Sequence, residues 1–240
     1  MGTAGWAIPR AVADRFPTEG TSLVRYGERF SAAEINSTFW RRHRPGTLER
    51  WRDSVPRAFR FAVKVPRTIT HERELRGTRS LLVQFFEDIA GLKSRQGPLL
   101  LQLPPSLVFA GPRAGRFFAL LRELHQGAVV CEARHGSWNQ PAADALLTTH
   151  GIARVAADPP RFSGGDEPAG ARSIAYFRLH GAPIVYRSAY GAERLRRLAA
   201  RLRAAARHAH VWCIFDNTAS GAAAGDALEL EAILAEAPGT

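Results

Sequence analysis

Charged and amide side chains stand where short apolar runs of this 240-residue chain end. Carboxylates and histidine are the side chains that most often transfer protons in enzymes, and Lys and Arg hold anions or developing negative charge. We therefore predict a catalytic group of Glu34, Lys64, Glu132 and His180. Further residues near the ends of these runs are predicted to bind substrate: Asn36, His71, Gln102, Arg134, Trp138, Arg178 and Asn217.

Lys64 stands out because of the composition of the chain. All but two of the 33 basic residues are Arg, so the sequence uses Arg wherever a positive charge alone is needed. Lys64 nevertheless lies inside the apolar stretch 59–65. A compact amine whose pKa can shift would explain a lysine there, and placement by chance is the alternative.

The apolar runs predict eight β-strands, spaced roughly 20 to 40 residues apart as in units of a strand followed by a helix. They cover residues 2–6, 33–36, 59–64, 98–103, 128–132, 153–157, 174–180 and 210–217. Amphipathic spacing and helix start and stop residues predict helices over 78–94, 139–150, 193–207 and 226–234.

Eight such units predict one domain, residues 1–240, folded as a closed (β/α)8 barrel of the TIM type. Segment 158–170 is rich in Pro and Gly, so we expect the sixth helix to be missing or distorted. An open doubly wound sheet is the rival, but it usually has a Gly-rich phosphate loop after its first strand, which residues 2–6 match poorly. In a barrel the C-terminal ends of the strands form one rim, where the polar residues should converge.

Alternation predicts which side chains point into the barrel. Within 174–180, Tyr176, Arg178 and His180 share the inward face, and the residues between them should pack on helices. By the same count Glu34 and Asn36 share a face. Several charges on one rim indicate a site, and the alternative is a buried network in which they only satisfy one another.

The net charge of +11 and a pI near 11.0 favour an anionic partner. A phosphorylated small molecule is the first choice, and nucleic acid is the alternative because basic segment 41–44 follows the second predicted strand. A generally basic surface is the plain explanation. We expect a cytoplasmic protein without a membrane partner, since no signal peptide or membrane-length apolar run is visible. The oligomeric state cannot be read from the sequence.

No cofactor motif is evident, and we assign no metal ligand. A divalent metal stays an alternative, because several residues could ligate one, although none are paired at the short spacings typical of zinc enzymes. These candidates are His71, Glu132, His135, Asp158, His180 and Asp216.

Ordered sequence blocks resemble the YecE-like family, also called domain of unknown function 72. The blocks are residues 2–6, 34–39, 59–66, 69–71, 101–106, 132–138, 176–181 and 215–217. The resemblance implies a TIM-type barrel and no particular reaction. That barrel is similar to endonuclease-IV-like and xylose-isomerase-like folds, which is a weak guide to function. This chain has Asp216 where the family commonly has Asn, which adds negative charge beside Asn217.

The leading hypothesis is an enzyme that binds an anionic or phosphate-bearing substrate at the C-terminal rim. Glu34 or Glu132 would transfer protons, and Lys64, Arg178 and His180 would bind the anion. A hydrolase or a lyase is expected, but no reaction can be assigned. The alternatives are a nucleic-acid-processing enzyme of the endonuclease-IV-like kind, with or without a metal, and a non-catalytic binding or scaffold protein.

Overall fold

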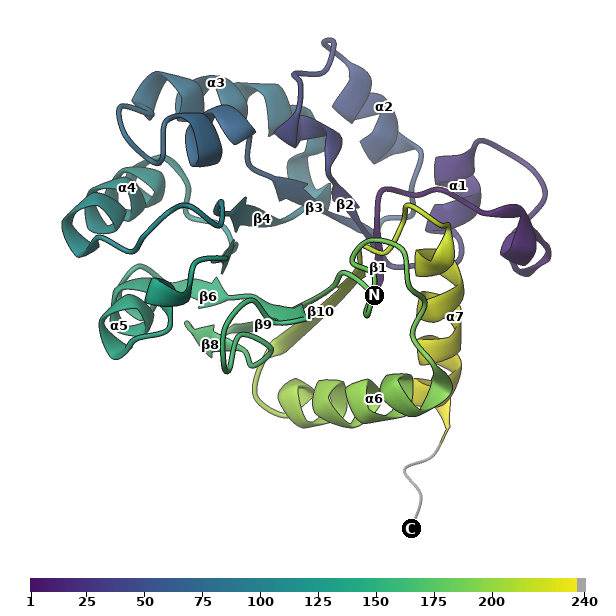
Figure 1. The fold of residues 1–240 in the computed structure, drawn as a ribbon. Coiled ribbons are helices and arrows are strands. Elements are labelled where there is room, and N and C mark those ends of the chain that lie inside the picture. Colours follow the sequence, from purple (N-terminus) through teal and green to yellow (C-terminus); the bar gives the residue numbers. More distant parts are fainter. Residues whose placement is uncertain (237–240) are drawn as a thin grey trace.

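Ten strands form one sheet in the computed structural model, which describes residues 1–236 (Figure 1). The strands are β1 (Gly2–Ala4), β2 (Ala32–Ile35), β3 (Arg60–Lys64), β4 (Gln96–Gln102), β5 (Val129–Glu132), β6 (Ile152–Arg154), β7 (Ala156–Asp158), β8 (Ala169–Gly170), β9 (Ile174–Leu179) and β10 (His210–Phe215). The α-helices are α1 (Ser22–Gly27), α2 (Thr47–Asp53), α3 (Arg79–Ile89), α4 (Gly111–Leu124), α5 (Pro141–Thr149), α6 (Ala192–Ala206) and α7 (Ala222–Ala235). The helices surround the strands.

The sheet closes on itself through the segment 152–158. The first piece of that segment, β6, pairs in parallel with β5, and its second piece, β7, pairs in parallel with β9. From β9 the parallel pairing continues through β10, β1, β2, β3 and β4 back to β5. If β6 and β7 are taken as one strand, the barrel has the eight parallel strands that the sequence predicts. The predicted (β/α)8 barrel is therefore confirmed.

Strand alternation divides the interior into an apolar layer and a charged layer. One inward position on each of six strands is apolar or aromatic: Ala32, Ala62, Leu100, Val130, Tyr176 and Ile214. Two residues further along each strand comes a buried polar or charged side chain: Glu34, Lys64, Gln102, Glu132, Arg178 and Asp216. Because the strands are parallel, these six residues lie at the same end of the barrel. The predicted inward direction of Tyr176 and Arg178 is confirmed.

The predicted helices are present, with two shifted boundaries. The expected helix over 78–94 ends at Ile89 and continues as a 3₁₀ turn in which Lys93 has a φ of 47°. Helix α7 begins at Ala222 rather than at residue 226. Helix α4 was not predicted, although its buried residues Ala114, Phe117, Phe118 and Leu121 have helical spacing.

The sixth helix of the barrel is missing, as predicted. Between β7 and β9 the chain forms only the two-residue strand β8, which pairs antiparallel with β6. Within residues 1–236, no helix is long and apolar enough to cross a membrane.

Candidate active site

Arg178 is the centre of the charged layer and has no exposed surface. Its guanidinium donates to Glu34, with 2.7 Å from Nη2 to Oε1 and 3.1 Å from Nε to Oε2. The hydroxyl of Tyr176 donates to the same carboxylate at 2.9 Å. Nη2 of Arg178 also lies 3.0 Å from Oδ2 of Asp216. Burial alone would lower the pKa of Arg178, but the three carboxylates around it raise that pKa well above its usual value.

Glu132 accepts hydrogen bonds from four different side chains. The donors are Gln102 (3.1 Å), Arg178 (3.0 Å), Arg134 (2.8 Å) and, through a ring nitrogen, His180 (3.1 Å). Burial alone would raise the pKa of this carboxyl, but Arg178, His180 and Arg134 hold it well below its usual range. Glu132 is therefore an ionised anchor whose two oxygens are both engaged.

His180 lies between two carboxylates. Its Nε2 is 3.1 Å from Glu132 and its Nδ1 is 2.9 Å from Oδ2 of Asp216. Two acceptors on opposite sides of one ring are satisfied together when both nitrogens carry a proton. Burial alone would raise the pKa of Asp216, but Arg178 and His180 lower it by more, so the pKa lies below its usual value.

Lys64 differs from the other buried charges because no carboxylate pairs with it. Its side chain lies over the ring of Phe39, with Nζ 4.2 Å from the ring centroid. The residue is 7% exposed, and within residues 1–236 no hydrogen bond or ion pair reaches Nζ. Burial, and next the positive charge of Arg178, lower the pKa of Lys64 to about 8. The ammonium form therefore predominates at neutral pH, with a minor fraction of free amine.

His71 lies beside Lys64, in the π-helical turn Thr68–Glu72 that follows β3. Its ring packs edge-on against Phe39, with centroids 5.0 Å apart, and Nδ1 is 2.8 Å from the hydroxyl of Thr70. Burial and the charge of Lys64 lower the pKa of His71 to about 4. His71 is therefore a neutral imidazole at pH 7.

Three more side chains complete the rim. Asn36 donates to Oδ1 of Asp216 at 3.3 Å, and its own buried Oδ1 accepts no hydrogen bond. Arg134 donates to the hydroxyl of Tyr186 at 3.1 Å, and the Tyr186 ring lies edge-on to His180, with centroids 5.5 Å apart. Tyr186 has a φ of 68°, a conformation that bulky residues rarely adopt and that is often found at functional sites.

Two predicted substrate-binding residues lie outside this group. Trp138 is 2% exposed, and its indole donates to the carbonyl oxygen of Leu107 at 2.9 Å, so the ring packs in the core. Asn217 is fully buried and donates to the carbonyl oxygen of Ser188 at 2.9 Å and to Asp226 at 2.5 Å. Neither side chain presents surface to a ligand. The other nine predicted residues, which include Arg178 and Lys64, lie together at the rim.

The candidate metal ligands do not form a metal site. Within residues 1–236, no group of three or more His, Cys, Asp or Glu side chains is arranged to hold a metal ion. Asp158 pairs instead with Arg194, and His135 with Ser137. The three candidates that do meet, Glu132, His180 and Asp216, are all in contact with Arg178 or its partners.

Three residues of the site were not predicted to act in catalysis or substrate binding, although Asp216 was considered as a metal ligand. Asp216 could have been included because it comes two positions after inward-facing Ile214. Phe39 covers Lys64 and is buried, but the next residue, Trp40, is exposed. The sequence pattern did not show which of these two aromatic residues faces the site. Tyr186 lies in the loop between β9 and α6, where no periodicity exists to indicate direction.

Closed parallel pairing, surrounding helices and a charged layer at the C-terminal ends of the strands define a TIM-type barrel with a polar rim. The whole chain, residues 1–240, matches the family described as "Protein of unknown function DUF72". The chain belongs to this family.

Relatives agree with this assignment. The chain is 37% identical to UPF0759 protein YecE of Escherichia coli K12 over 93 residues, which is 39% of this chain and only 33% of that protein. A DUF72 family protein of Thermotoga maritima has a TM-score of 0.82 at 24% identity, covering 98% of both chains. One from Enterococcus faecalis has a TM-score of 0.81 at 19% identity, covering 99% of this chain and 96% of the other. At these identities the solved structures establish the fold alone.

Proposed function

We propose that this protein is an enzyme that binds an anionic, carboxylate- or phosphate-bearing small molecule at the C-terminal rim of the barrel, with Lys64 as the residue that contacts it. One observation carries the proposal: Lys64 is a buried cation without a carboxylate partner, beside acids that are all paired. Burying an unpaired charge costs stability, so a bound anion is the simplest group to complete the site.

The surrounding residues support distinct roles. Glu34 and Glu132 are saturated with donors, so we assign them the positioning of Arg178, Arg134 and His180 rather than proton transfer. The unpartnered Oδ1 of Asn36 can accept a hydrogen bond from the substrate. Neutral His71 and the minor free-amine form of Lys64 are the groups able to take up a proton, and a free amine can also attack a carbonyl carbon.

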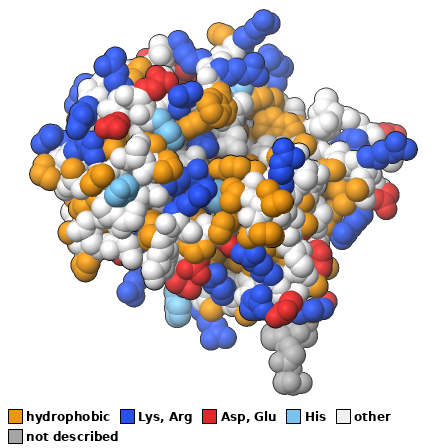
Figure 2. All heavy atoms as spheres, in the orientation of Figure 1, with side chains coloured by type: hydrophobic (Ala, Val, Ile, Leu, Met, Phe, Trp, Pro, Cys, Tyr) orange, Lys and Arg blue, Asp and Glu red, His pale blue; other side chains and the backbone are white. Residues whose placement is uncertain are grey.

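The nucleic-acid alternative has weaker support. Arg42 in the basic segment is already held by Asp88 through two hydrogen bonds of 2.7 Å. On the face drawn in Figure 2, basic side chains are scattered over the edges and the middle, with acidic ones between them, rather than gathered into one stripe. Continuous basic surface is what tracking a phosphate backbone requires.

Calorimetric titration of wild type and Lys64→Met with small carboxylates and phosphorylated compounds tests the proposal. We expect at least one anion to bind wild type and to lose about tenfold or more in affinity in the variant. Lys93→Met is the matched control, since it removes the other lysine, which is exposed, and should leave binding unchanged. Equal affinities in wild type and Lys64→Met, or equal losses in both variants, would refute the role of Lys64. Binding without turnover would support the non-catalytic alternative instead.

A further inference from the structure

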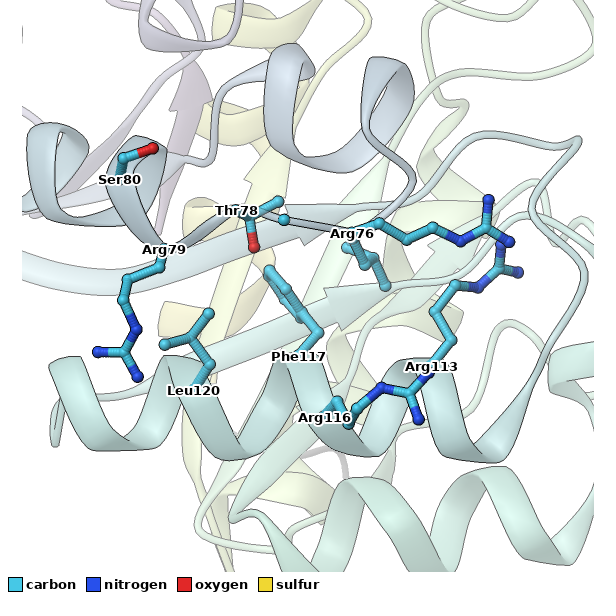
Figure 3. Close-up of a pocket in the computed structure, with 10 residues that line it drawn as sticks. Arg76, Thr78, Arg79, Ser80, Arg113, Arg116, Phe117 and Leu120 are labelled. Atoms are coloured by element: carbon cyan, nitrogen blue, oxygen red, sulfur yellow. The ribbon is translucent and has the colours of Figure 1, made fainter.

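A basic cavity lies outside the barrel, between the start of α3 and the first turns of α4 (Figure 3). Its volume is about 660 Å³. Four arginines line it: Arg76 and Arg79 from the α3 side, and Arg113 and Arg116 from α4. It shares no residue with the rim described above.

The arginines of this cavity are only partly neutralised. Arg113 is held by Glu74 at 3.2 Å and by a backbone carbonyl. Arg79 donates two hydrogen bonds to Glu123, at 2.8 and 2.7 Å, but both side chains are more than half exposed, so water and salt screen this pair. Arg116 is exposed and makes no ion pair within residues 1–236. Four positive charges thus face two carboxylates.

Thr78 gives independent evidence that the cavity holds a ligand. The residue is 2% exposed, and its buried Oγ1 has no hydrogen-bond partner. Thr78 occupies the N-cap position of α3, where a threonine hydroxyl normally accepts from a helix amide, yet here it makes no such bond. Figure 3 shows the hydroxyl pointing away from α3 toward the side chains of α4 that line the cavity. A buried hydroxyl without a partner is costly and is expected to meet one when a ligand is bound.

The N-terminus of α3 adds further donors. The amide of Leu82 donates to the Thr78 carbonyl oxygen at 2.9 Å, whereas the three amides before it have no helical acceptor. Free amides and the positive end of the helix dipole favour a group with several negatively charged oxygens. Arginine forks favour the same group, because their geometry matches phosphate.

We propose that this cavity is a second anion site, separate from the rim, that binds the phosphoryl group of inorganic phosphate or of a small phosphomonoester. The Thr78 hydroxyl and the first amides of α3 donate to the phosphoryl oxygens, and Arg116 with Arg79 neutralises them. The exposed arginine side chains move aside to admit the ligand and then cover it.

Calorimetric titration of the full chain with inorganic phosphate at low ionic strength tests this site. The Lys64→Met background removes the rim lysine, so that failure of the rim proposal and failure of this one are distinguishable. We expect phosphate to bind in that background, and Thr78→Val to weaken it about tenfold, the effect of a lost hydrogen bond to a charged ligand. Thr78→Ser should retain the affinity because it keeps the hydroxyl, and Arg116→Gln should weaken binding several-fold.

The control is Arg57→Gln, an exposed arginine before β3 and therefore at the opposite end of the barrel. It removes the same charge and should leave phosphate affinity unchanged. The proposal is overturned if phosphate does not bind, if adding Thr78→Val to the Lys64→Met background leaves the affinity unchanged, or if Arg57→Gln weakens binding as much as Arg116→Gln. Methyl phosphate should bind and dimethyl phosphate should bind more weakly. A Thr78-dependent preference for the diester would assign the site to a nucleic-acid backbone and also overturn the proposal.

Discussion

The two sides of the charged layer differ in how their buried charges are partnered. Around Arg178, each carboxylate has its donors, and the guanidinium has its acceptors, so the groups hold one another in fixed positions. On the side of Lys64, the cation lies over an aromatic ring without a carboxylate, and its pKa falls. The difference separates a structural network from a group held ready for a ligand, because burial without a partner lowers stability and persists where function requires it.

The largest change in unfolding free energy is expected for Arg178→Met. It leaves Glu34, Glu132 and Asp216 without their shared cation, which should cost about 3 to 5 kcal/mol of unfolding free energy. For a chain of this size Tm should fall by about 6 to 20 °C. Urea unfolding measures the loss, with exposed Arg57→Met as a control expected to lie within about 0.5 kcal/mol of wild type. A variant as stable as wild type would mean that the network is not structural.

Lys64→Met should change the unfolding free energy in the opposite direction and stabilise the fold. It replaces a desolvated cation with an apolar side chain of similar length, and the lowered pKa corresponds to at most about 3 kcal/mol. We expect a gain of about 1 to 3 kcal/mol in unfolding free energy at pH 7, measured by the same urea titration. Lys93→Met should change stability by less than about 0.5 kcal/mol. A destabilised Lys64→Met would show that Lys64 belongs to the paired network.

The gain in unfolding free energy of Lys64→Met over wild type should also depend on pH. Below pH 8 the folded and unfolded chains both keep the Lys64 proton, so its burial cost is fully present. Between about pH 8 and the ordinary value of 10.5, the folded chain releases the proton while the unfolded chain retains it, so wild-type stability rises relative to Lys64→Met. Unfolding of the pair at pH 7 and pH 9.5 measures this, and a difference that does not shrink would contradict the lowered pKa.

Tyr176→Phe should give the smallest effect. It removes the hydroxyl that donates to Glu34 but leaves the Arg178 fork on that carboxylate. We expect a loss of about 1 to 2 kcal/mol, by urea unfolding, with the ring still packed against Trp212. A loss as large as that of Arg178→Met would mean that Glu34 depends on both donors together.

The strand ends and the inward direction of their side chains could be predicted because the period of a strand is two. From this period we predicted that Glu34, Lys64, Glu132 and Arg178 lie on one rim. It could not predict which charges pair, since Arg178 reaches Glu34 and Glu132 across the barrel, and those distances depend on the stagger of strands far apart in sequence. The same limit applied to Trp138 and Asn217, which follow strands but turn into the core. Helix α4 was detectable from its apolar spacing.

The segment that closes the barrel is divided between two neighbours. β6 is bonded to β5 on one side and to the two-residue strand β8 on the other, whereas β7 is bonded to β9. The ladder to β5 ends at Arg154 and the ladder to β9 begins at Ala156, so neither neighbour is paired along the whole of this segment. Amide hydrogens of residues 152–158 should therefore exchange with solvent through small local openings, before the rest of the barrel opens. This segment is where we expect the closed sheet to separate first.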